Sequence, residues 1–203
     1  MTMRVREDSD NTFTNFLIMK NLNKYMTNIG FGDSNFNFAV YIANKPSMLE
    51  YQDIAEVRAL VAGEINVINQ ACGNGWRKVF NVYAKLLYAL DKKSFDYLAK
   101  AATWQDYRDK YLLQRQSKTA LLFSIPQLSI NTENNEVVHI ICGKGHAKEL
   151  INKSKLVTNL VWLDDEFAID SENRLIVCPY FDYRQLSNIK IERVADLLQS
   201  LKT

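Results

Sequence analysis

Val137-Val-His-Ile-Ile-Cys-Gly-Lys-Gly-His-Ala147 is the stretch of sequence that decides the fold. An apolar run of strand length stops at Gly143, and helix-forming residues follow from Ala147 to about Lys153. A short, continuous apolar run that leads into a helix is typical of a strand buried on both faces of a parallel sheet. We therefore predict a strand, a glycine turn and a helix here.

Three further apolar runs have the length of buried strands, and helical patterns lie between them. The runs cover residues 36–43, 120–125 and 175–178. Apolar spacing and capping residues predict helices over residues 50–72, 76–90, 94–102, 103–113 and 188–201. Alternating strands and helices predict an α/β fold, a three-layer α/β/α sandwich with a mainly parallel central sheet of about four strands. A mixed sheet is the alternative, because residues 157–178 can supply a hairpin.

The length and composition of the chain fit a single α/β domain over residues 1–203. Residues 1–35 are expected to form a polar tail and a short helix that packs on this domain and ends near Gly30 and Gly32. The net charge of +2 creates no strong field that would draw the protein to nucleic acid or to a membrane. The sequence does not specify an oligomeric state.

No stretch reaches the roughly 18 apolar residues of a membrane span. The N-terminus also lacks the apolar segment of a signal peptide. We therefore expect a cytoplasmic protein without membrane contact. Three cysteines without CxxC spacing and only two histidines predict free thiols, no structural metal site and no cofactor.

All three prolines of the chain follow predicted strands, at Pro46, Pro126 and Pro179. Proline lacks the N–H that a strand ladder needs, so these residues are interpreted either as strand ends alone or as part of a site. Cations and aromatic rings accompany them: Lys45, Lys144, His146, Arg184, Tyr180 and Tyr183. Ligands of open parallel sheets bind beyond the carboxyl ends of the strands. We therefore predict a pocket there for a ligand with a flat ring and an anionic group.

Gly143-Lys144-Gly145-His146 is the glycine-rich loop at one of these strand ends. It lacks the spacing of a Walker loop, and Lys148 stands where a dinucleotide-binding loop has its third small residue. It is interpreted either as an anion site at a helix N-terminus or as a tight turn. A second glycine break, Gly73-Asn74-Gly75-Trp76-Arg77-Lys78, is interpreted either as another such turn at a helix start or as a helix break with Trp76 packed in the core.

Three segments, in their order along the chain, resemble motifs of the uracil-DNA glycosylase superfamily. Leu121-Leu-Phe-Ser-Ile-Pro-Gln-Leu128 is similar to the second strand of that family, which ends at a base-reading residue, here Ser124. His139-Ile-Ile-Cys-Gly-Lys-Gly-His-Ala147 is similar to its third strand and the start of the next helix. Leu175-Ile-Val-Cys-Pro-Tyr-Phe-Asp-Tyr-Arg-Gln-Leu-Ser187 resembles its last strand and the loop that grips DNA. The resemblance implies a four-stranded parallel sheet flanked by helices, with the active site at the carboxyl ends of the strands.

Two departures from that family bear on catalysis. The last loop has Asp182-Tyr183-Arg184 where the family carries a histidine, and Asn44 stands one residue further from Pro46 than in the mismatch-specific branch. The resemblance therefore implies a protein that binds a nucleobase, nucleotide or nucleic acid, with weakened or lost hydrolysis of N-glycosidic bonds. If hydrolysis occurs, Asn44 places the water, and Asp182 or Arg184 meets the developing charge. The implied ligand-binding residues are Lys45, Ser124, Gln127, Gly143, Lys144, Gly145, His146, Tyr180, Tyr183 and Arg184.

Two other classes of function stay open. A non-catalytic protein–protein interaction domain would use Trp104, Tyr107 and Tyr111, which lie at helical spacing. A thiol hydrolase would use Cys178 as its nucleophile and His146 as its base.

Overall fold

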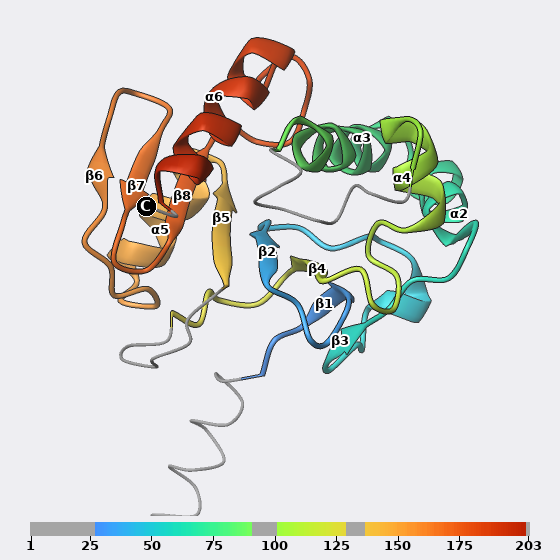
Figure 1. Cartoon of the computed structure of the whole chain (residues 1–203). Helices are drawn as coiled ribbons and strands as arrows, with labels where there is room; N and C mark the ends of the chain where they lie inside the picture. The colour runs from blue at the N-terminus through green and yellow to red at the C-terminus, as the bar shows by residue number, and fades with distance from the viewer. Residues whose placement is uncertain (1–26, 91–100, 129–136, 202–203) are drawn as a thin grey trace, which may run out of the picture.

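The computed structural model describes residues 27–90, 101–128 and 137–201, in which eight strands form one sheet (Figure 1). The strands are β1 (Gly30–Gly32), β2 (Phe38–Tyr41), β3 (Val57–Arg58), β4 (Thr119–Leu122), β5 (Val138–Cys142), β6 (Val161–Trp162), β7 (Ala168–Asp170) and β8 (Leu175–Cys178). The helices are η1 (Leu49–Tyr51), α2 (Glu64–Cys72), α3 (Asn74–Ala89), α4 (Trp104–Lys110), α5 (Lys144–Asn152) and α6 (Asn188–Ser200). The strand order is β3-β1-β4-β2-β5-β8-β7-β6, and the chain has an α/β fold.

The centre of the sheet consists of β4, β2, β5 and β8, which are neighbours in that order and run parallel. Val40 in β2 pairs with Leu121 on one side and with Ile140 on the other. Cys142 and Cys178 pair at the carboxyl ends of β5 and β8. Every residue of these four strands is buried, because helices or loops cover both faces of the sheet.

The prediction of a mainly parallel sheet of about four strands is wrong, because further strands extend the sheet at both edges and make it mixed. β1 pairs antiparallel with β4 and carries the edge strand β3. On the other side, β7 pairs antiparallel with β8 and β6 pairs antiparallel with β7. The antiparallel strands β6 and β7 form the hairpin that the alternative of a mixed sheet expected within residues 157–178. β1 and β3 have only two or three residues each, too few to show as an apolar run in the sequence.

β1 lies where a helix was expected to end. Its two glycines allow the backbones of β1 and β4 to approach closely. A Cβ on Gly30 would lie 2.2 Å from the carbonyl oxygen of Leu121, and one on Gly32 would lie 2.2 Å from that of Thr119. Glycine is therefore required here for strand packing and does not mark a helix end.

The predicted helix over residues 50–72 is also wrong, because this region forms η1, β3 and only then α2. Gly63 precedes α2 with a φ of 86°, a conformation that interrupts a helix. The helices predicted over 76–90, 103–113, 147–153 and 188–201 are confirmed as α3, α4, α5 and α6. Thr103 caps α4 as predicted, since its hydroxyl accepts a hydrogen bond from Asp106 N at 3.1 Å. The helices expected before residue 27 and over residues 94–100 lie outside the described residues.

Helices cover both faces of the sheet (Figure 1). On one face α3 and α6 pack through Phe80 and Val194 against the larger of two hydrophobic cores. On the other face α5 packs through Ala147 and Leu150 against the smaller core. Within the described ranges, no helix combines the length and the apolar character needed to cross a membrane.

Candidate functional site

The four loops predicted to build a pocket lie at one edge of the sheet, because each follows one of the parallel strands β2, β4, β5 and β8. From β2 the chain crosses to β4 on one side, whereas β5 lies on the other side of β2. The helix after β5 packs on the opposite face of the sheet from α3. The sheet therefore has a topological switch point between β2 and β5, which is where ligands of open α/β sheets bind.

The first turns of α3 lie against the loops at this edge. α3 begins after Gly73, whose φ is 79°. Trp76 meets the ring of Phe123, directly after β4, edge-on with 6.2 Å between the ring centres. Lys78 Nζ lies 2.8 Å from Asp182 Oδ2, in the loop after β8. α3 thus joins the loops that follow β4 and β8.

Asp182 is a nearly buried carboxylate held by two cations. Lys78 Nζ and Arg184 Nη2 donate to its Oδ2 atom at 2.8 and 2.9 Å. The backbone N–H of Arg184 donates to Oδ1 at 3.0 Å. The hydrogen bonds from Arg184, and then that from Lys78, hold the pKa of Asp182 well below its usual range. Its charge is already balanced, so the geometry suits a residue that positions the loop better than one that accepts a proton.

Tyr183 and Arg184 project from this loop into solvent. The Tyr183 residue is 57% exposed and the Arg184 side chain is 70% exposed. Lys78 Nζ lies 5.1 Å from the centre of the Tyr183 ring, within the range of a cation–π contact. We call Lys78, Asp182, Tyr183 and Arg184 the platform. It presents an aromatic ring beside two cations at the carboxyl edge of the sheet.

Sequence reasoning named Lys78 only within the glycine break at residues 73–78 and did not join it to the platform. It lies 104 residues before Asp182 in the chain, so no local motif joins the two. The available signal was the glycine break at 73–75, which sets the start of α3 at this edge.

Lys144 turns away from the platform toward the hairpin of β6 and β7. Its Nζ atom lies 3.2 Å from Asp165 Oδ1 and 5.5 Å from the centre of the Trp162 ring. Gly143 has a φ of 97° and supplies the tight turn into α5. His146 is half-buried on α5, and burial lowers its pKa. The contacts of Lys144 are thus with the β6–β7 hairpin, and none of them involves Arg184. Gly143 makes the turn from β5 into α5.

The loop after β2 presents Asn44 and Lys45 at the surface. The ammonium group of Lys45 donates to the backbone carbonyl of Gln52, just after η1. The Gln52 side chain in turn donates to the Pro46 carbonyl at 3.0 Å. These bonds fix the shape of the loop, and Asn44 is left at its exposed bend.

The loop after β4 carries Ser124 and Gln127, both half-buried. The Ser124 hydroxyl accepts a hydrogen bond from the backbone N–H of Ile29 at 3.2 Å. Ser124 therefore links this loop to the residue before β1.

Tyr180 lies half-buried just after β8, whose last residue, Cys178, is the register partner of Cys142 in β5; both cysteines are free thiols. Burial raises the pKa of Tyr180 and also that of the Cys142 thiol. The Cys178 thiol is fully buried and donates to the Pro179 carbonyl at 3.4 Å. No contact among the described residues joins Cys178 to His146, so the geometry gives a thiol mechanism no support.

Within the described residues, no group of three or more histidine, cysteine, aspartate or glutamate side chains is placed to hold a metal ion.

The aromatic residues of α4 do not form an open face. Tyr107 is buried, and Trp104 and Tyr111 pack partly buried against the larger core. The side chains of Lys85 and Arg108 also lie over the Trp104 ring, at 5.2 and 5.6 Å. These aromatic rings are therefore explained by packing.

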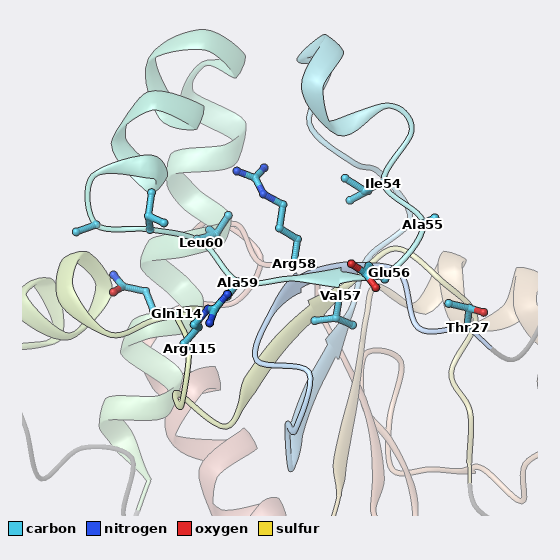
Figure 2. A pocket seen from close by; sticks show the side chains of 12 residues that line it. Thr27, Ile54, Ala55, Glu56, Val57, Arg58, Ala59, Leu60, Gln114 and Arg115 are labelled. Atoms are coloured by element: carbon cyan, nitrogen blue, oxygen red, sulfur yellow. The ribbon is translucent and has the colours of Figure 1, made fainter.

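A cavity of about 890 Å³ lies along the edge strand β3 (Figure 2). Residues 54–62 line it together with Thr27, Gln114 and Arg115, and none of these was predicted as a site residue. Its volume is that of a small-molecule site. Arg58, which lines the cavity, pairs with Glu64 at 2.7 Å. None of its lining residues belongs to the four loops at the carboxyl edge.

Comparisons with known proteins identify a family. No curated protein and no solved structure matches the chain. A match to DUF6942, a family of unknown function, covers residues 29–199. This range includes every strand of the sheet and the whole platform. The chain therefore belongs to the DUF6942 family.

Proposed function

We propose that the chain binds a nucleic-acid strand at the platform. In this proposal a base stacks on the Tyr183 ring and the adjoining phosphates contact Lys78 and Arg184. The observation that carries it is the placement of Lys78 Nζ 5.1 Å from the centre of an exposed tyrosine ring. Proteins that bind single strands combine stacking rings with cations in this way. The forked guanidinium of Arg184 also suits a phosphate.

The elements next to the platform support a strand of several nucleotides over a single nucleotide. Arg77 precedes Lys78 on α3, and Lys45 lies in the loop after β2; both are exposed. Leu49 in η1 and Ile189 at the start of α6 are large, exposed apolar side chains. Cations contact phosphates, whereas exposed apolar side chains contact bases, and here both kinds occur on one open edge.

The resemblance to uracil-DNA glycosylases supports the same edge of the sheet as the binding site. Within the proposal, hydrolysis of N-glycosidic bonds is weak or absent. Asp182 is already paired with two cations, and the loop after β8 has no histidine. Asn44, at the exposed bend after β2, is the residue that would place a water if base release occurs.

Binding of a fluorescent single-stranded DNA, measured by anisotropy at several salt concentrations, tests the proposal. We expect Tyr183→Ala to weaken binding by roughly 5- to 100-fold, the effect of losing one stacked base. Arg184→Ala removes one phosphate contact and should reduce the slope of log affinity against log salt by about 0.7. Lys110→Ala is the matched control, since Lys110 is an exposed cation on α4 paired with Asp106, and it should leave both quantities unchanged.

The same strand with uracil in place of one base tests for base release, which we expect to be absent or slow. Fast release would overturn the proposal of weakened catalysis. Failure to bind single- or double-stranded DNA at low salt would overturn the binding proposal. Equal affinities for the wild type, Tyr183→Ala and Arg184→Ala would show that binding occurs elsewhere.

A further inference from the structure

β6 forms one edge of the sheet, and no strand within residues 27–90, 101–128 and 137–201 pairs with its outer side (Figure 1). The backbone N–H of Leu163 donates to the Phe167 carbonyl at 2.9 Å, so Leu163 turns its backbone groups toward the β7 side. Hydrogen-bonding groups alternate along an antiparallel strand. Leu160 and Trp162 therefore direct their N–H and C=O groups outward, where a further strand can pair with them.

The side chains along this edge alternate as well. Leu160 and Trp162 pack onto the smaller core. Val157, Val161 and Leu163 are 82%, 61% and 42% exposed. Exposed edge strands in proteins usually carry lysine, proline or a bulge that prevents pairing with another chain. Here the exposed side chains are three aliphatic ones and Asn159, so these positions carry neither lysine nor proline and leave the edge open to pairing.

The segment of residues 155–165, which contains β6, carries opposite charges at its two ends. Lys155 lies exposed before β6. Asp165 lies fully exposed after it, at the tip of the β6–β7 hairpin, where its Oδ1 atom is 3.2 Å from Lys144 Nζ and its remaining surface faces solvent. An antiparallel copy of the same segment would place each charge opposite its complement. The edge is therefore complementary to itself, the property that a two-fold symmetric contact requires.

We propose that β6 pairs antiparallel with β6 of a second copy of this chain and so continues the sheet across a two-fold axis at Leu160. The outward backbone groups allow several registers, and the opposite charges select the one with Leu160 opposite Leu160 and Trp162 opposite Thr158 of the second copy. This register places Val157 opposite Leu163 and Lys155 opposite Asp165 at both ends of the contact. The contact uses no residue of the platform, so it is independent of the proposed function.

Sedimentation equilibrium of the full chain over a wide range of concentrations tests the pairing. We expect a monomer–dimer equilibrium. In Lys155→Glu, and separately in Asp165→Lys, both end contacts join like charges, so the dissociation constant should rise by roughly tenfold or more. An equimolar mixture of the two variants should recover the wild-type affinity, because each mixed dimer again joins opposite charges at both ends.

Leu163→Glu introduces two carboxylates between the apolar side chains and should weaken the dimer by roughly a hundredfold or more. Lys110→Glu on α4 is the control and should not change the equilibrium. A chain that is monomeric at every concentration would overturn the proposal. A dimer insensitive to these variants, or a mixture that does not recover affinity, would overturn it as well.

Discussion

Tyr41 and His139 form a buried polar pair on the α5 side of the sheet. The Tyr41 hydroxyl lies 2.9 Å from His139 Nδ1, and the two rings stack with 5.8 Å between their centres. The backbone of Gln127 also hydrogen-bonds to Tyr41. Burial raises the pKa of Tyr41 and lowers the pKa of His139 to about 4. Both side chains therefore stay neutral in the folded protein near neutral pH.

His139 should make the free energy of unfolding depend on pH. In the unfolded chain it takes up a proton near pH 6.5, its ordinary pKa, whereas the folded protein resists this down to about pH 4. Between these values the unfolded state binds more protons, so stability is lost as the pH falls through this window. The loss should approach about 3 kcal/mol at the lower limit.

Urea unfolding at several pH values across this window measures the effect, with His139→Gln as the comparison. We expect the variant to lose much less stability between the two limits than the wild type. Asp182 takes up a proton in the unfolded chain only near its ordinary pKa of about 4, so its contribution is confined to the acidic end of the window, below about pH 5. Burial also lowers the pKa of His146, which is unchanged in both proteins and cancels in the comparison. Parallel curves for the two proteins would show that another group causes the dependence.

At the scale of elements, the length of a strand decides whether the sequence reveals it. β2, β4, β5 and β8 have four or five buried residues, and each is visible as an apolar run. β3 has two residues, and it is a strand because of the neighbour with which it pairs. β6 is equally short, but it lies in the segment 157–178 from which a hairpin was expected. Separation along the chain decides which platform residues could be predicted together. Asp182, Tyr183 and Arg184 share one loop and were predictable as a group, whereas Lys78 belongs to a helix 104 residues earlier in the sequence and was not.

The close approach of β1 to β4 predicts opposite effects of alanine at two glycines. In Gly30→Ala the new methyl group would lie 2.2 Å from a backbone oxygen, so the strands must separate. We expect a loss of about 3 kcal/mol in the free energy of unfolding. Gly145→Ala is the control: its Cβ would meet nothing within 4 Å, and it lies inside α5.

Gly145→Ala should therefore leave the protein unchanged or stabilise it by about 0.5–1 kcal/mol, the helix preference for alanine. Chemical unfolding of both variants measures the difference. Equal stabilities would mean that β1 does not pack against β4 as closely as described.

At the scale of the whole molecule, the platform also joins the layers. Lys78 belongs to α3, and Asp182 belongs to the loop that connects β8 to α6. Their ion pair, with Arg184 beside it, links the helix layer to the carboxyl edge of the sheet. The loop that we propose to bind nucleic acid is thus held in place before any ligand arrives.

Asp182→Asn should destabilise the protein by about 1–3 kcal/mol, because the nearly buried ammonium group of Lys78 and the more exposed guanidinium of Arg184 lose their charged acceptor. Asp106→Asn is the matched control, since it also removes an aspartate paired with a lysine, but at a more exposed site on α4. It should change stability by about 0.5 kcal/mol or less. Thermal unfolding compares the two variants. Similar midpoints for both would refute a structural role for the Asp182 pairs.

The central position of β2 has a consequence for how the chain reaches this structure. Phe38 pairs with Thr119 and with Val138, about 80 and about 100 residues further along the chain, and such distant pairings make folding slow. During synthesis, β2 leaves the ribosome with neither of its neighbours available. Its apolar residues stay unpartnered until β5 has also emerged, which is the interval in which a chaperone would find the most surface to bind.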